Sequence, residues 1–244
     1  MKKIIIMGAS SGIGLALAEA FASRGVRIGV AARSLAPLCR LADKYPGMVE
    51  TASIDVTDPK APQGLHELIG RLGGMDLYIH VAGIALRNPD LNPDIEVRVA
   101  ETDAVGFARM VSAAFRYLMT EGNAGQIAAV TSVAGTRGIS ELSAYSASKS
   151  FASTYLEALQ QLARTRRLPI AVTDIRPGWT RTPLIDPDKS YMLEMQLERV
   201  VPDILRAIAR RKRVAVIDWR WAMVCGLWRL LPRTLWIRLH GFGL

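Results

Sequence analysis

Residues 3–24 contain the pattern that most limits the fold of this chain. A short apolar run from Lys3 to Met7 is followed by Gly8-Ala9-Ser10-Ser11-Gly12-Ile13-Gly14 and then by a helical pattern up to about Arg24. Glycines allow a backbone to approach a pyrophosphate closely, and the free N–H groups at a helix N-terminus attract anions. A glycine-rich turn can be purely structural, but this order favours a phosphate-binding loop built from Gly8, Ser10, Ser11, Gly12, Ile13 and Gly14.

Short apolar runs alternate with amphipathic stretches along the rest of the chain. We expect strands at residues 3–7, 27–32, 49–54, 76–81, 126–131, 169–175 and 214–217, and helices at 13–24, 34–44, 59–71, 95–119, 143–164 and 202–211. This alternation predicts an α/β fold with a doubly wound parallel sheet of about seven strands and helices on both faces. We assign the sheet to one domain at residues 1–217, followed by an extension at 218–244.

Composition argues against a disordered chain, a disulfide-stabilised protein and a metalloprotein. Half of the 244 residues are hydrophobic and 22% are charged, which is typical of a folded globular chain. Cys39 and Cys225 have the spacing of neither a metal site nor a disulfide framework, which suits a reducing, cytoplasmic compartment. The three histidines are scattered, so no metal site is expected.

A serine, a tyrosine and a lysine follow the fifth expected strand. Ser132 ends that strand, and Tyr145 and Lys149 lie four residues apart, on one face of the next helix. A tyrosine hydroxyl titrates near ~10, and a nearby cation lowers that pKa. The three residues can therefore act as a carbonyl-polarising serine, a tyrosine acid/base and a lysine that tunes the tyrosine. A chance Tyr-Lys pair on a solvated helix face is the alternative.

The end of the second strand bears on the choice of cofactor. An acidic residue at this place binds a ribose 2′-hydroxyl, whereas an arginine accommodates a 2′-phosphate. Here Ala32 occupies the place of the acid and Arg33 follows it. The pattern favours NADP(H) over NAD(H), unless Arg33 is only a solvated arginine at a strand end.

At this point the chain resembles the short-chain dehydrogenase/reductase family over roughly residues 1–217. The glycine loop, the pair Asp55-Val56, the set Ser132, Tyr145 and Lys149, and Pro177-Gly178 with Thr182 match family motifs in order. The resemblance implies a Rossmann fold. It also implies adenine contacts from Asp55 and Val56, cofactor contacts from Ala82 and Gly83, and nicotinamide contacts from Pro177, Gly178 and Thr182.

By the same resemblance, hydride passes between nicotinamide and a carbonyl carbon, and Tyr145 donates the proton. Lys149 lowers the tyrosine pKa and holds the nicotinamide ribose, and Ser132 stabilises the oxyanion. The resemblance also implies that the chain forms a homodimer or homotetramer.

Three positions depart from the family pattern. His80-Val81-Ala82-Gly83 replaces Asn-Asn-Ala-Gly after the fourth strand, and Met7 replaces the threonine before the glycine loop. Asp103 takes the place of the helix asparagine that completes the catalytic tetrad. The family asparagine holds a water of the proton relay through its backbone and a local helix distortion. We expect Asp103 to keep this catalytic role while shifting the pH profile.

The C-terminal extension concentrates charge and tryptophan. Residues 199–244 contain ten basic and two acidic residues, so +8 of the net charge of +9 lies there, and residues 219–239 hold four of the five tryptophans. Arginines and a proline interrupt the apolar residues too often for a membrane span. Peripheral membrane contact through 218–239 is one interpretation. Packing over the substrate cleft or against a second subunit is the other. Nucleic acid is not expected as a partner.

The combined pattern favours an NADP(H)-dependent oxidoreductase acting on a ketone or secondary alcohol. Trp179, Leu184, Ile185, Tyr191, Met192 and Met195 fall in an expected mobile flap at residues 179–199 and favour a hydrophobic or acyl-type small-molecule substrate. One alternative is a cofactor-binding sensor or scaffold that has lost catalysis. An isomerase or dehydratase that uses tyrosine and lysine around nicotinamide is another.

Overall fold

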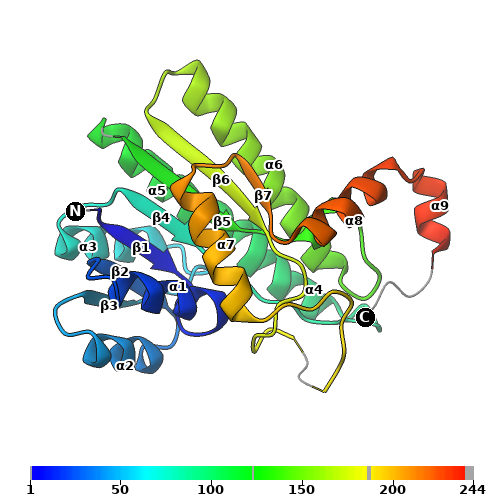
Figure 1. Cartoon of the computed structure of the whole chain (residues 1–244), viewed down its shortest axis with the longest axis horizontal. Helices are drawn as coiled ribbons and strands as arrows, with labels where there is room; N and C mark the ends of the chain where they lie inside the picture. Colours follow the sequence, from blue (N-terminus) through cyan, green and yellow to red (C-terminus); the bar gives the residue numbers. More distant parts are fainter. Residues whose placement is uncertain (1, 123, 186–187, 240–244) are drawn as a thin grey trace.

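A computed structural model describes residues 2–122, 124–185 and 188–239 (Figure 1). Its sheet has seven parallel strands in the order β3-β2-β1-β4-β5-β6-β7. The strands are β1 (Ile4–Met7), β2 (Ile28–Ala32), β3 (Val49–Ser53), β4 (Leu77–His80), β5 (Gly125–Val130), β6 (Ile170–Arg176) and β7 (Val214–Val216). The predicted doubly wound sheet is confirmed, and each expected strand is present within two residues of its expected ends.

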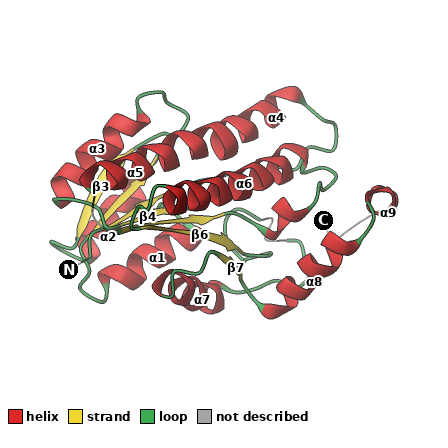
Figure 2. Cartoon of the chain, turned by 90° about the horizontal axis from the view of Figure 1, so that it is seen from above, coloured by secondary structure: helices red, strands yellow, loops and turns green. Residues whose placement is uncertain are grey.

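Helices cover both faces of the sheet, as expected (Figure 2). The helices of the α/β domain are α1 (Gly12–Ala22), α2 (Ala36–Lys44), α3 (Ala61–Leu72), α4 (Pro93–Ala100), α5 (Phe107–Glu121), α6 (Ser143–Thr165) and α7 (Leu197–Ala209). Strand β1 shows why helices have to cover both faces of the sheet. Ile4 and Ile6 belong to the core that contains α1 and α7, whereas Ile5 and Met7 belong to the core that contains α3, α5 and α6. Because alternate side chains point to opposite faces, a wholly apolar strand requires cover on both sides.

The connections reverse direction at β1. From this strand the chain builds outward to β2 and β3 on one side and then crosses to β4, β5, β6 and β7 on the other. In such sheets a crevice opens beyond the carboxyl ends of the strands, at the point of reversal. The segments that follow β1, β4, β5 and β6 therefore meet at one edge.

The long helix expected at residues 95–119 is not continuous. Between α4 and α5, Glu101–Gly106 form a π-helical turn (η1), which buries Thr102 and Asp103. Single π-turns within helices are often found at functional sites. The helix expected at 202–211 also differs, because α7 already begins at Leu197 and includes Pro202. Val200 and Val201 pack into the core and extend the helix toward its N-terminus.

Two helices follow β7 at one end of the molecule (Figures 1 and 2). They are α8 (Trp219–Leu230) and α9 (Arg233–Arg238). Trp221, Cys225 and Trp228 on one side of α8 are buried and join the core next to the sheet. Among the described residues, no helix combines the length and the apolar character that a membrane crossing requires.

Candidate active site

The glycine loop lies between β1 and α1, at the crevice. Gly14 is packed so closely that a Cβ atom there would lie 2.1 Å from the carbonyl oxygen of Gly8, so glycine is required. Ser11, at the N-cap of α1, forms no side-chain cap hydrogen bond. The N–H groups of the first turn are therefore available to an anion, which fits the phosphates of a dinucleotide.

The crevice contains a cavity of about 420 Å³ that gathers most of the residues singled out in the sequence. The predicted residues that line it are Gly8, Ser10, Ser11, Gly12, Ile13, Arg33, Asp55, Val56, Ala82, Gly83, Ser132, Tyr145, Lys149, Pro177, Gly178 and Thr182. Gly14 and Asp103 do not line the cavity: Gly14 packs under the loop, and Asp103 lies behind Lys149.

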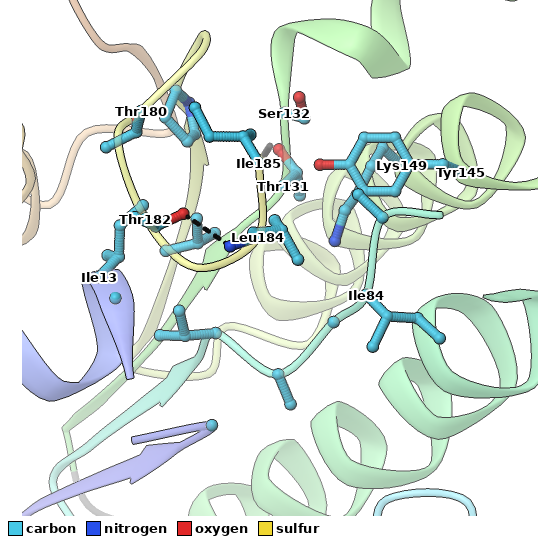
Figure 3. Close-up of a pocket in the computed structure, with 18 of the residues that line it drawn as sticks. Ile13, Ile84, Thr131, Ser132, Tyr145, Lys149, Thr180, Thr182, Leu184 and Ile185 are labelled. Carbon is cyan, nitrogen blue, oxygen red and sulfur yellow. Dashed lines mark hydrogen bonds between the residues drawn. The ribbon is translucent and has the colours of Figure 1, made fainter. Parts of the chain in front are cut away.

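Ser132, Tyr145 and Lys149 converge at one end of the cavity (Figure 3). Tyr145 and Lys149 come from α6, and the Lys149 Nζ lies 5.3 Å from the centroid of the Tyr145 ring. Ser132 follows β5 and caps the short 3₁₀ turn η2 (Val133–Thr136), its Oγ accepting from Ala134 N at 3.1 Å. The hydroxyl of Ser132 also acts on Tyr145 and lowers its pKa. This geometry can hold a carbonyl oxygen between two hydroxyl groups.

Asp103 forms a buried ion pair with Lys149. Its Oδ2 lies 2.8 Å from the Lys149 Nζ, with the two side chains 0% and 9% exposed. The other carboxylate oxygen accepts a hydrogen bond from Ile84 N at 2.7 Å. The π-turn thus presents Asp103 to the loop after β4 and to the lysine at the same time.

The pKa values in this cluster follow from burial and from that ion pair. Burial raises the pKa of Tyr145, and the positive charge of Lys149 opposes this rise without cancelling it, while the carboxylate of Asp103 adds to it. Burial alone would lower the pKa of Lys149, but the charges of Asp103 and Tyr145 more than offset it and raise that pKa. The charge of Lys149 therefore lowers the pKa of Tyr145, as expected, but burial outweighs this effect and the pKa is raised overall.

His80 is a buried neutral side chain behind the site. Its Nδ1 lies 3.0 Å from the Tyr78 hydroxyl, and its ring packs edge-on against Phe107. Burial, with a contribution from the charge of Lys149, lowers its pKa to about 3. A histidine with this pKa is uncharged near neutral pH, so it does not compete with Lys149 for the Asp103 carboxylate.

The opposite end of the cavity carries Arg33 and Asp55. Arg33 is exposed at the end of β2, beyond the buried Ala32. Asp55 Oδ1 accepts from the backbone N–H of Thr57 at 2.9 Å and from its hydroxyl at 2.7 Å. Burial would raise the pKa of Asp55, but these hydrogen bonds and the charge of Arg33 outweigh it and lower that pKa.

Two tryptophans of α8 line the same cavity, which agrees with the interpretation that the C-terminal extension packs over the substrate cleft. Trp221 and Trp228 form part of its wall, and Trp221 Nε1 donates to Leu193 O at 3.2 Å. Gly178 makes room for Trp221, because a Cβ there would lie 2.1 Å from the indole nitrogen. The concentration of tryptophan after β7 was the available indication.

Arg137 holds α8 in this position. Its guanidinium donates to the carbonyl oxygens of Trp228 at 2.9 Å, Arg229 at 3.1 Å and Leu231 at 2.6 Å. A cation at the C-terminal end of a helix both satisfies free carbonyl groups and complements the helix dipole. The loop after Ser132 is therefore tied directly to the C-terminal helices.

Comparison with known proteins agrees with this site. Residues 2–191 match the short chain dehydrogenase family. An oxidoreductase of Myxococcus xanthus is 33% identical over 238 residues, which cover 95% of this chain and 93% of the relative. A crystal structure of a short-chain type dehydrogenase/reductase from Mycobacterium marinum has a TM-score of 0.80 and 27% identity, covering 90% of this chain and 95% of the other. A short-chain dehydrogenase from Sphingobium yanoikuyae in complex with NADPH has a TM-score of 0.78 and 25% identity, covering 96% and 98%. The chain belongs to the short-chain dehydrogenase family and is an NAD(P)-dependent oxidoreductase.

Proposed function

We propose that the protein transfers hydride between NADP(H) and a hydrophobic or acyl-type ketone or secondary alcohol. The observation that carries this proposal is the convergence of Ser132, Tyr145 and Lys149 on the cavity that also contains the glycine loop. The bound cofactor supplies or accepts the hydride. The chain's own residues hold the cofactor, orient the carbonyl and move the proton.

In the direction of reduction, Tyr145 donates its hydroxyl proton to the carbonyl oxygen. Its raised pKa keeps this proton in place near neutral pH. Ser132 donates a hydrogen bond to the same oxygen and stabilises the charge that develops there. Lys149 lies beside the tyrosine ring and stabilises the phenolate after the proton has left.

Arg33 supports the preference for NADP(H). It lines the cavity directly after β2, whose last residue is Ala32 and not the acidic residue that would bind a ribose 2′-hydroxyl. We expect Arg33→Glu to weaken use of NADPH at least tenfold and to improve use of NADH, whereas Arg40→Glu on the exposed side of α2 leaves the ratio unchanged. Equal kcat/KM ratios in all three proteins would contradict the assigned preference.

Much of the cavity wall is apolar. Ile84, Ile139 and Trp179 pack in one cluster with Tyr145, and Met192, Trp221 and Trp228 also line the cavity. In the described part of the chain, the charged residues that line it are Arg33, Asp55 and Lys149. Lys149 is paired with Asp103, and the other two lie at the far end. This lining supports a neutral, lipophilic substrate more than an anionic one.

The test is NADPH oxidation with ketones of increasing chain length, from small diketones to long-chain 3-keto lipids. We expect turnover that rises with apolar length and falls by a factor of about 10² or more in Tyr145→Phe. Tyr155→Phe, on the same helix but outside the cavity, is the matched control and should retain turnover. Loss in both variants, or retention in both, would remove Tyr145 from the proposed role.

A second candidate function is a cofactor-dependent sensor or scaffold without turnover. It is favoured by one observation, the ion pair that engages the Lys149 ammonium with Asp103 at 2.8 Å. NADPH binding measured by calorimetry, with no oxidation of any ketone, would support this function over the first.

We also propose that the chain forms a homodimer or homotetramer through its long helices. Val97 and Val105, on the α4–α5 segment, and Phe151, on α6, are apolar and exposed in the single chain. Light scattering should then give a multiple of 26.7 kDa, and Val105→Glu with Phe151→Glu should reduce it to a single chain. A monomeric wild-type protein would contradict this assembly.

A further inference from the structure

We propose that α8 and α9 bind the surface of an anionic lipid bilayer and place it at the mouth of the reaction cavity. The outer face of α8, defined as Trp219, Met223, Leu227 and Leu230, carries the first argument. These side chains are 67%, 58%, 61% and 81% exposed. Their spacing of four, four and three residues places them on one side of the helix.

Specific contacts hold α8 against the rest of the chain, so the side chains of its outer face are exposed while the helix is packed in place. Arg137 binds the carbonyl groups at its C-terminal end, and Asp218 accepts from Arg220 N at its N-terminal end at 2.9 Å. Trp221 and Trp228 pack inward. An exposed apolar face on a fixed helix, rimmed by polar residues, marks an interaction surface.

Helix α9 extends the same kind of surface. Ile237 is 71% exposed and Leu235 is 49% exposed. Trp236 anchors the helix to the domain, because its Nε1 donates to Gly138 O at 2.8 Å and its ring packs edge-on against Trp228. The segment therefore presents apolar side chains outward while its tryptophan faces the domain.

Charge identifies the partner. Residues 219–239 contain four arginines and no acidic residue. Arg233 and Arg238 are exposed beside the apolar side chains of α9. A second copy of this face would bring arginines against arginines, whereas an anionic headgroup layer complements them. Apolar side chains next to arginines are typical of segments that lie in a membrane interface.

The location of this surface links it to the substrate. The inner face of α8 lines the reaction cavity through Trp221 and Trp228, while the outer face meets the bilayer. A single helix then separates membrane from cavity, and a lipophilic ketone reaches Tyr145 without crossing bulk water. This step rests on the proposed function, but the binding of the membrane does not.

The test is flotation of the full chain with vesicles of phosphatidylcholine alone or of phosphatidylcholine mixed with phosphatidylglycerol. We expect the protein to float with the anionic vesicles only, and less so at high salt. Met223→Gln with Leu227→Gln should reduce the bound fraction by about tenfold. The matched control is Leu91→Gln with Val214→Gln, which removes two exposed apolar side chains elsewhere and should leave flotation unchanged. Circular dichroism and NADPH binding verify that each variant is folded.

Three results would overturn the proposal. The first is absence of the wild-type protein from the floating fraction, and the second is equal flotation of both paired variants. The third is a dimer that becomes a monomer only when Met223 and Leu227 are changed, because this result would assign the outer face of α8 to a second copy of the chain. Activity is assayed separately with a short soluble ketone. Flotation without turnover of this ketone or of any ketone in the chain-length series refutes the proposed reaction alone, and turnover without flotation refutes the membrane surface alone.

Discussion

Asp103 Oδ2 lies 2.8 Å from Lys149 Nζ, and this contact gives the site a buried carboxylate beside its lysine. The pair is formally neutral, so the tyrosine experiences less positive charge than an unpaired lysine would supply. The same carboxylate is held by the Ile84 N–H and by the π-turn. We therefore propose that Asp103 positions Lys149, and its charge raises the pKa of Tyr145.

Asp103→Asn should move the pH profile of ketone reduction toward lower pH. The Asp103 charge raises the pKa of Tyr145, so its removal lowers that pKa, and the tyrosine loses its proton at a lower pH. Because reduction requires the protonated tyrosine, the alkaline limb of kcat/KM shifts downward. Measurement of kcat/KM against pH for both proteins tests this.

Asp103→Ala provides the control for that experiment. It removes the same charge but also the acceptor of the Ile84 N–H, so the pH shift should be accompanied by a lower melting temperature than in Asp103→Asn. Superimposable profiles of the wild type and both variants would show that Asp103 does not influence Tyr145.

His80 should make the protein less stable in mild acid. Its pKa is about 3 in the folded protein against 6.5 for an ordinary histidine, so the unfolded state binds the proton more strongly. The stability that this histidine contributes is complete above the unfolded pKa and is lost as the pH falls toward 3. Between pH 7.5 and pH 5 the loss should be about 2 kcal/mol in the free energy of unfolding.

Urea denaturation of wild type and His80→Asn at the two pH values isolates this contribution, because other groups titrate in both proteins. The variant should lose less stability on acidification by about the same 2 kcal/mol. An identical loss of stability in both proteins would mean that folding does not lower the pKa of His80.

Gly178→Ala should displace Trp221. The added Cβ would fall 2.1 Å from the indole nitrogen, so the helix or the loop has to move, at a cost of about 1–3 kcal/mol. Gly226→Ala, within α8 itself, meets no atom within 4 Å and should be neutral or stabilising by about 0.5–1 kcal/mol. Tryptophan fluorescence and thermal melting compare the two, and equal effects would argue against close packing of Trp221 on this loop.

Arg137→Met should loosen α8. The variant keeps an apolar stem but loses the hydrogen bonds to Trp228, Arg229 and Leu231, at a cost of about 1–3 kcal/mol. Hydrogen exchange should increase in α8 and α9 and stay unchanged in α1. The matched control is Arg116→Met on the exposed side of α5, and equal exchange in both variants would contradict the anchoring role of Arg137.

Much of the fold follows from local sequence patterns. Short apolar strands such as Ile4–Met7 cannot remain at a surface, and their alternation with helices leaves few arrangements besides a parallel sheet. The gathering of the predicted residues in one cavity follows as well, because the carboxyl ends of parallel strands meet at one edge. The sequence left open whether the C-terminal extension reaches the cavity, since this depends on Trp221 fitting against Gly178.

The sequence by itself determined the order of elements, the family and the choice of Ser132, Tyr145 and Lys149 as candidate residues, because these properties reside in local spacing and hydrophobic period. The tertiary structure decided the π-turn at Glu101–Gly106, the direction in which the Tyr145 pKa is shifted and the contribution of α8 to the cavity wall. Each of these depends on contacts between distant segments, such as Arg137 with the carbonyl group of Leu231. Burial and the distances between charges set their energies, and both arise only when the chain has folded.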